Sequence, residues 1–287
     1  LQGVPMKILT IANNKGGVGK TFLAKLLAEY AVMIRGWRVL LLDFDPQTNL
    51  SRRYLDMDVV SDGGPDDFVP PPHPDADETT RHYSVANIWD LEEVLPYETA
   101  FENLDIIPAH ANRLQEIEYR PPHDLNHSVV LAKFFEAFKD DDLYDLVIID
   151  TRPSKGRLNT AALHVSTHVV IPTELEAPSV EGLVGMIGLV NRVRDVRTGD
   201  CPLSVCGVLA NKAQMNTVIH KEHWEMLNSL EGVGEYIVEP PLPHRVVYKE
   251  SMLYGQPSIW VNGGKSEEAQ AALPAVERVM SCVMGGS

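Results

Sequence analysis

The stretch that decides the fold of this chain is Asn13-Asn14-Lys15-Gly16-Gly17-Val18-Gly19-Lys20-Thr21. The apolar residues 8–12 before it predict a strand, and the mostly apolar residues 22–34 after it predict a buried helix. A glycine-rich turn in this context folds tightly and directs backbone N–H groups toward a phosphate chain at the helix N-terminus. Lys20 is placed to reach the β- and γ-phosphates, and the Thr21 hydroxyl to coordinate Mg²⁺. The sequence therefore predicts a nucleotide-binding loop made of Asn14, Lys15, Gly16, Gly17, Val18, Gly19, Lys20, Thr21 and Phe22.

The loop departs from the standard phosphate-binding pattern at two positions. The first glycine of that pattern is replaced by Asn14, and a second lysine, Lys15, follows it. Because of Lys15 the loop resembles that of the deviant Walker-A ATPases, which include the ParA partition proteins, MinD and the nitrogenase iron protein. In that family the early lysine crosses a dimer interface and contacts the nucleotide of the other subunit. The resemblance implies a catalytic role for Lys15 and a homodimer that forms with ATP.

Two further strand ends carry aspartates. The continuous apolar run 39–42 predicts a strand buried on both faces, and it leads into Asp43-Phe44-Asp45-Pro46-Gln47 at the end where ligands bind in parallel sheets. This segment resembles the D-x-D-P-Q segment of ParA proteins, which implies that Asp45 orients the attacking water and that Asp43 lies near Mg²⁺. The apolar run 146–149 ends in Asp150, the pattern of a Walker-B element that holds Mg²⁺ together with Thr21.

A fourth strand end is expected to bind the base. Residues 203–210 predict a strand that ends in Asn211-Lys212, and an Asn amide both donates to and accepts from the edge of an adenine. The run Pro240-Pro241-Leu242-Pro243 resembles the family loop that packs against the adenine face. The expected base site therefore consists of Asn211, Lys212, Pro241, Leu242 and Pro243. Glu176 falls where family members often place a carboxylate near the nucleotide of the partner.

The net charge of −15 argues against a DNA-binding protein, but the acidity is concentrated in one segment. Residues 56–105 contain 14 acidic residues and one basic residue, whereas the rest of the chain has 26 acidic and 24 basic residues. A basic face is therefore still compatible with the sequence. The candidates for non-specific DNA contact are Arg192, Arg194 and Arg197 near the end of one predicted helix, with Lys221 and Arg245 from other elements. A solvated helix end is the alternative interpretation of this cluster.

Several other features predict surface or compartment. Residues 56–82 are acidic and proline-rich and are expected to form an exposed loop or disordered insert in a single domain that spans residues 6–287. Lys25 and Glu29 are expected to be a solvated pair on the first helix. The three cysteines Cys201, Cys206 and Cys282 predict neither a disulfide framework nor a metal cluster, which favours the cytoplasm.

These patterns predict an α/β fold, a doubly wound and mostly parallel sheet flanked by helices, of the P-loop NTPase type. The leading hypothesis is a ParA-like ATPase that uses ATP and Mg²⁺, dimerises on ATP and binds DNA non-specifically on the nucleoid. A ParB-like or cargo-adaptor protein would then stimulate hydrolysis, so that a plasmid, chromosome region or protein cargo is positioned. A MinD-like placement ATPase is an alternative, although the final helix, residues 266–284, has only Arg278 as a basic residue and predicts no membrane anchor. A metabolic enzyme of the same fold, such as dethiobiotin synthetase, is a third possibility.

Overall fold

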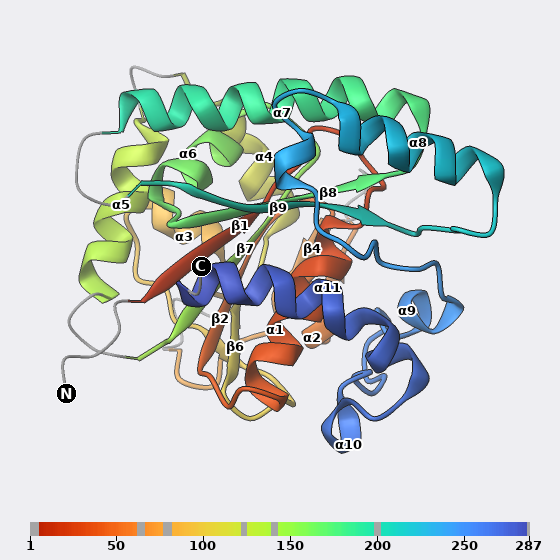
Figure 1. The fold of residues 1–287 in the computed structure, drawn as a ribbon. Coiled ribbons are helices and arrows are strands. Elements are labelled where there is room, and N and C mark those ends of the chain that lie inside the picture. The colour runs from red at the N-terminus through yellow and green to blue at the C-terminus, as the bar shows by residue number, and fades with distance from the viewer. Residues whose placement is uncertain are drawn as a thin grey trace.

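The computed structural model of the chain describes residues 6–61, 67–76, 82–121, 125–138, 143–197 and 202–285. At the centre of this part of the chain lies a seven-stranded sheet in the order β5-β6-β2-β7-β1-β8-β9 (Figure 1). Every neighbouring pair is parallel except β5 and β6, which confirms the predicted fold class. In spatial order the strands are β5 Tyr97–Glu98, β6 Leu104–Ile107, β2 Val39–Phe44, β7 Leu146–Thr151, β1 Lys7–Ile11, β8 His168–Glu174 and β9 Ser204–Asn211.

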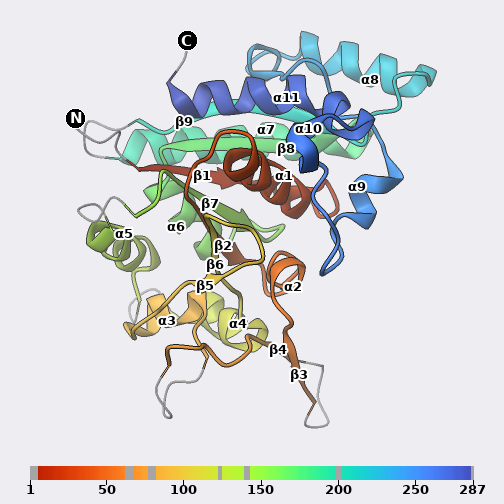
Figure 2. The same ribbon diagram turned by 90° about the horizontal axis from the view of Figure 1, so that it is seen from below.

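Helices cover both faces of the sheet (Figures 1 and 2). One face packs against α1 and α11, and the other packs against the layer that contains α3 to α7. The helices of the described residues are α1 Lys20–Met33, α2 Ser51–Tyr54, α3 Val85–Asp90, α4 Ala111–Tyr119, α5 His127–Phe138, α6 Arg157–Val165, α7 Ala177–Val196, α8 Val218–Ser229, α9 Val246–Glu250, α10 Val261–Gly264 and α11 Glu267–Met284, with a 3-10 turn at Gly234–Tyr236.

The apolar runs of the sequence account for the central strands. In β2 and β7 every residue is buried, because alternate side chains enter the cores on the two faces of the sheet. Leu41 and Ile148 belong to the core beneath α1 and α11, whereas Leu42 and Ile149 belong to the core beneath α3 to α6. The strands therefore present their carboxyl ends, and the polar residues that follow, along one edge of the sheet.

The described part of the segment 56–82 is more ordered than the sequence predicts. β3 (Asp58–Val60) pairs antiparallel with β4 (Asp67–Val69), and the proline-rich stretch after it packs against the body of the protein. His73 is 8% exposed, its Nε2 lies 3.1 Å from the carbonyl oxygen of Pro96, and its ring contacts that of Tyr97 edge to face. Residues 67–76 are therefore partly buried, with Pro70 and His73 inside and Pro72, Pro74 and Asp75 exposed. Residues 62–66 and 77–81 lie outside the described part.

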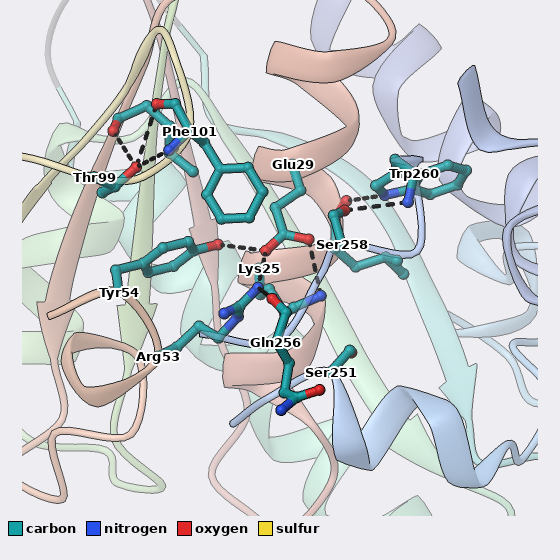
Figure 3. A network of polar contacts seen from close by, with 12 residues as sticks. Lys25, Glu29, Arg53, Tyr54, Thr99, Phe101, Ser251, Gln256, Ser258 and Trp260 are labelled. Atoms are coloured by element: carbon teal, nitrogen blue, oxygen red, sulfur yellow. Dashed lines mark hydrogen bonds and ion pairs between the residues drawn. The ribbon is translucent and has the colours of Figure 1, made fainter. Parts of the chain in front are cut away.

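Lys25 and Glu29 are also not a solvated pair. Both side chains are fully buried, and Lys25 Nζ lies 2.9 Å from Glu29 Oε2 (Figure 3). The second carboxylate oxygen, Glu29 Oε1, accepts from Arg53 Nη2 at 3.1 Å and from the Tyr54 hydroxyl at 3.3 Å. Arg53 also donates to the carbonyl oxygens of Leu253 and Gln256. The solvent-facing side predicted for α1 is thus covered by α2 and by the chain that follows α9.

Candidate nucleotide site

The glycine-rich loop leads from β1 into α1, and Gly19 is the N-cap of that helix with φ of +89°. A side chain is excluded here, because an added Cβ would lie 2.0 Å from Asn211 Nδ2. The Asn211 amide donates to the carbonyl oxygen of Val18 at 3.0 Å. The end of β9 is therefore hydrogen-bonded directly to the loop. It follows that the Asn211 Nδ2 group predicted to read adenine is engaged by the loop itself.

Lys20 points into the loop that precedes it. Its side chain is buried, and Nζ donates to the carbonyl oxygen of Lys15 at 3.1 Å. Burial lowers the pKa of Lys20, while the nearby carboxylates of Asp150 and Asp45 oppose that shift. The ammonium group is thus held inside the loop, where it can donate to the oxygens of a phosphate chain.

Asp43 and Asp150 are register partners on the neighbouring strands β2 and β7, and both are fully buried. Asp43 is well satisfied: its oxygens accept from the backbone N–H of Asp45 at 3.0 Å and from the Ser51 hydroxyl at 2.7 Å. Burial raises the pKa of Asp43 to about 7, an effect that the Ser51 hydroxyl partly offsets.

Asp150 is different, because both of its carboxylate oxygens are buried without a hydrogen-bond partner among the atoms of the described residues. Burial, and next the charge of Asp43, raises the pKa of Asp150, while the Thr21 hydroxyl and Lys20 act in the opposite direction. A buried carboxylate with free lone pairs beside a hydroxyl is an oxygen donor set of the kind that Mg²⁺ prefers. Asp150 and Thr21 therefore fit a magnesium site, and Asp43 lies beside them with its own oxygens already hydrogen-bonded.

Asp45 follows β2 and closes a short turn. Its side chain is 8% exposed, and Oδ1 accepts from the backbone N–H of Gln47 at 3.0 Å. Its carbonyl oxygen accepts from the backbone N–H of Thr48 at 2.9 Å. The turn fixes the carboxylate close to Lys20 and Asp150, whose pKa values it affects.

Lys15 lies at the rim of the loop. Asn13 Oδ1 accepts from the backbone N–H of Lys15 at 2.9 Å, and the Lys15 ammonium forms an ion pair with Glu176 at 3.2 Å. The Lys15 side chain is 26% exposed and that of Glu176 is 59% exposed. A second rim pair joins Lys212 to Glu174 at 2.5 Å, and Lys212 Nζ also donates to the carbonyl oxygen of Gly17. The side-chain amide atoms of Asn14 are buried without a hydrogen-bond partner in the described structure.

A cavity of about 410 Å³ adjoins the loop at the expected base site. Phe22 and Tyr248 stack in its lining with ring centroids 5.1 Å apart, and Lys212 and Pro243 also line it. Leu242 is fully buried and hydrogen-bonds through its backbone to Ala210 and Ala213, so its side chain belongs to the core. Pro241, partly exposed beside Leu242, does not line the cavity. Tyr248 was not predicted, since a tyrosine near the start of a short helix has no distinctive pattern.

The five basic residues proposed for DNA contact are not gathered on one face. Arg194 Nε donates to the carbonyl oxygen of Leu203 at 2.7 Å, and Arg197 donates to that of Ser166. Leu203 and Ser166 precede β9 and β8, so these guanidinium groups lie at the amino edge of the sheet together with the exposed Arg192.

The other two basic residues lie beyond the carboxyl edge. Lys221 is exposed in α8, which follows the end of β9, and Arg245 lines the base cavity and pairs with Glu267 at 2.9 Å. The two sets of basic residues therefore lie apart, because α7 runs the length of the sheet and carries its last turn to the opposite edge (Figure 1), and DNA contact by any of them stays a prediction. None of the described helices is both long and apolar enough to cross a membrane.

Comparison with known proteins agrees with this geometry. Residues 6–201 match the protein family described as an AAA domain. The chain is 32% identical over 260 residues to the sporulation initiation inhibitor protein Soj of Bacillus subtilis, covering 88% of this chain and 90% of Soj. It is 27% identical over 280 residues to the chromosome partitioning protein ParA of Caulobacter vibrioides, covering 96% of this chain and 95% of the relative.

Solved structures share the fold at lower identity. The ATP complex of a single-residue variant of Cyanothece McdA has a TM-score of 0.73 at 20% identity and covers 99% of this chain and 98% of McdA. Cobyrinic acid a,c-diamide synthase from Mycobacterium smegmatis, with bound ADP and magnesium, has a TM-score of 0.70 at 21% identity, covering 98% and 97%.

Proposed function

This chain belongs to the ParA-type family of P-loop ATPases, and we propose that it partitions or positions cargo through an ATP-bound homodimer that grips DNA without sequence preference. The observation that carries the proposal is the position of Lys15. Its ammonium group lies at the rim of the loop, 3.2 Å from an exposed carboxylate, whereas the loop's other lysine, Lys20, is buried inside. This difference in position supports separate roles for the two lysines, with Lys15 acting on the phosphates of the other subunit.

ATP with Mg²⁺ is the ligand that the site fits, and the ADP, ATP and magnesium bound in the two structural neighbours support this assignment. The metal supplies charge neutralisation between the phosphates. Lys20 binds the phosphate chain, Thr21 and Asp150 hold the metal, and Asp45 orients the attacking water. Lys20→Ala or Thr21→Ala should abolish calorimetric binding of ATP·Mg²⁺. Asp45→Ala should still bind it but hydrolyse it slowly, because a misplaced water loses its orientation.

The in-trans role of Lys15 is tested by sedimentation with a non-hydrolysable ATP analogue. Lys15→Ala should keep nucleotide affinity but lose both ATP-dependent dimerisation and hydrolysis, since the cation that would stabilise charge in the other subunit is gone. Lys15→Arg should restore little, because a planar guanidinium does not replace a compact ammonium. Asp45→Ala is the matched control that binds ATP and still dimerises. Equal dimerisation of Lys15→Ala and Asp45→Ala would contradict the role of Lys15.

Non-specific DNA binding is tested on unrelated duplexes in the presence of ATP. Affinity should fall steeply with salt, because phosphate contacts release counterions. Arg192 lies at the amino edge of the sheet and Lys221 beyond the carboxyl edge, so Arg192→Ala and Lys221→Ala distinguish the two surfaces. The variant whose residue contacts DNA should bind every duplex more weakly, and by a similar factor. If the protein does not bind DNA in the presence of ATP even at low salt, the proposed DNA binding is wrong and a protein cargo is favoured.

A ParB-like or cargo-adaptor protein is the proposed activator of hydrolysis. Capture from the source cell in ATP with Asp45→Ala should retain it, because slow hydrolysis prolongs the bound state. The rate of ATP hydrolysis could instead be unchanged by DNA or a protein partner and require a small carboxylic acid. That result would favour a metabolic enzyme of this fold.

A further inference from the structure

A second cluster of chemically reactive side chains lies away from the nucleotide site. His168 is the first residue of β8, Cys206 lies in β9, and Cys282 lies in the last turn of α11. A ring nitrogen of His168 and the two sulfur atoms all lie within 4.8 Å of one another. His168 and Cys206 are each 8% exposed, and Cys282 is partly exposed. The spacing of 38 and 76 residues along the chain hides this cluster from sequence motifs, which explains why the cysteines predicted no metal site.

A β-bulge is what directs Cys206 toward the other two residues. The register of β8 and β9 shifts between Val169 and Val170, so that two steps along β9 match one step along β8. Because side chains alternate along a strand, Cys206 without the bulge would share the face of Val208. Instead Cys206 belongs to the core beneath α11, whereas Val208 belongs to the core on the opposite face.

The hydrogen bonds of Thr167 set the state of the His168 ring. The Thr167 hydroxyl lies 3.0 Å from the carbonyl oxygen of Ile8, which can only accept, so the hydroxyl proton occupies that contact. Thr167 Oγ1 must then accept from His168 Nδ1 at 2.7 Å. The proton on Nδ1 leaves the lone pair of Nε2 available, and a hydrogen bond of this type is what orients histidines that bind metals.

The two sulfur atoms form a donor pair beside this imidazole. Cys206 and Cys282 are close enough to form a hydrogen bond with each other. Zinc binding displaces the protons of both thiols, because the thiolate is the form of cysteine that binds metals. Two thiolates and one neutral imidazole would also balance the charge of a divalent cation.

We propose that His168, Cys206 and Cys282 bind one zinc ion and thereby fasten α11 to β8 and β9. Nitrogen and thiolate ligands in this combination favour zinc over Mg²⁺ or Ca²⁺, which prefer oxygen. Tetrahedral zinc with bonds of about 2.0–2.3 Å separates its ligand atoms by roughly 3.3–3.8 Å. Contraction of the cluster by about 1.0–1.5 Å from its 4.8 Å limit therefore suffices. The fourth position is left to water, because the described residues offer three ligands.

The test measures zinc on the full-length, reduced protein after chelator treatment. Titration against a chromophoric zinc chelator should show one site per chain, and the melting temperature should rise with zinc. Substitution of cobalt should give sulfur-to-metal charge-transfer absorption. Cys282→Ser and His168→Gln should each weaken binding by more than the roughly 10- to 100-fold expected for loss of a residue that only supports a ligand.

Matched controls separate this site from adventitious binding. Cys201→Ser removes a thiol and His164→Gln removes a partly buried histidine on α6, and neither should change zinc affinity. For wild-type protein, zinc should slow alkylation of Cys282 as mapped by mass spectrometry, a readout that does not depend on whether a variant folds. Absence of zinc binding by the reduced protein, or unchanged affinity in Cys282→Ser and His168→Gln, would overturn the proposal. The proposal would also be overturned if the reduced protein does not bind zinc and Cys206 and Cys282 form a disulfide in air.

Discussion

Lys25 Nζ lies 2.9 Å from Glu29 Oε2, and neither side chain has any exposed surface. Burial lowers the pKa of Lys25, and the carboxylate of Glu29 opposes that shift. The same carboxylate also pairs with Arg53 of α2. The single negative charge of Glu29, on the helix that begins in the nucleotide loop, is thus the shared partner of two buried cations. Glu29 is therefore the residue on which the electrostatics of this network depend.

Glu29→Gln should lower the free energy of unfolding by about 3–5 kcal/mol, because it leaves buried cations without a counter-charge. Urea unfolding measures this loss. Glu267→Gln is the matched control, since its pair with Arg245 is 76% exposed on the Glu267 side and 40% on the Arg245 side and should contribute about 0–1 kcal/mol. Equal, small effects of the two variants would show that the buried network does not stabilise the fold.

The raised pKa of Asp43 predicts that the stability of the protein depends on pH. Its folded pKa of about 7 lies above the ordinary value near 3.8, so between these values the folded protein binds a proton that the unfolded chain has released. The stability that this carboxyl contributes is complete below the unfolded pKa and is lost as pH rises toward 7, at up to about 1.4 kcal/mol per pH unit.

In nucleotide-free protein we therefore expect the urea midpoint to fall between about pH 4 and pH 7 and then to level. Asp43→Asn should flatten this slope. Its absolute stability should be lower, because the two Asp43 oxygens accept from the backbone N–H groups of Asp45 and Ser51, and an amide nitrogen cannot accept. Part of the slope should remain in Asp43→Asn, because burial also raises the pKa of Asp150. A slope unchanged by Asp43→Asn would assign the titration to another group.

Gly19→Ala should abolish nucleotide binding and destabilise the protein. The added Cβ would lie 2.0 Å from Asn211 Nδ2, and the left-handed φ of +89° strains any residue with a side chain. Gly36→Ala is the matched control, because φ is +68° but no atom lies within 4 Å of its Cβ. Gly36→Ala should therefore cost only about 1–2 kcal/mol of backbone strain and keep calorimetric ATP binding. Normal binding by Gly19→Ala would mean that the contact between the loop and β9 is dispensable.

Local patterns predicted the phosphate loop and the two aspartates of neighbouring strands for a physical reason. Parallel strands buried on both faces need continuous apolar runs, and their carboxyl ends meet at one edge, so Asp43 and Asp150 must lie near the loop. Their placement as register partners agrees with this expectation. Their roles toward the metal stay predictions.

Long-range packing accounts for what the sequence could not predict. The spacing of Lys25 and Glu29 is that of an exposed helical pair, and only the cover supplied by α2 and by the chain around Gln256 buries it. The sequence suggests solvated cations at Arg194 and Arg197, but carbonyl oxygens before β9 and β8 accept from them. The Cys206 bulge likewise depends on the pairing of two strands, which no local pattern encodes.

The ion pair between Lys15 and Glu176 gives a last prediction, which rests on the proposed in-trans role of Lys15. If Lys15 reaches the nucleotide of the other subunit, its ammonium must first leave Glu176, 3.2 Å away. An exposed pair of this kind contributes about 0–1 kcal/mol, and two such pairs break when a homodimer forms. Glu176 therefore opposes dimerisation by no more than about 30-fold in the dimer dissociation constant. Glu176→Gln should therefore dimerise with a non-hydrolysable ATP analogue at equal or up to about 30-fold lower protein concentration. Glu174→Gln, two residues away and paired with Lys212 instead, is the matched control.

A double variant tests whether Glu176 acts only through Lys15. In sedimentation, Lys15→Ala combined with Glu176→Gln should then behave like Lys15→Ala alone. Glu176→Gln could instead weaken dimerisation as strongly as Lys15→Ala does. That result would contradict the prediction and would mean that the Glu176 carboxylate contacts the nucleotide site of the partner subunit.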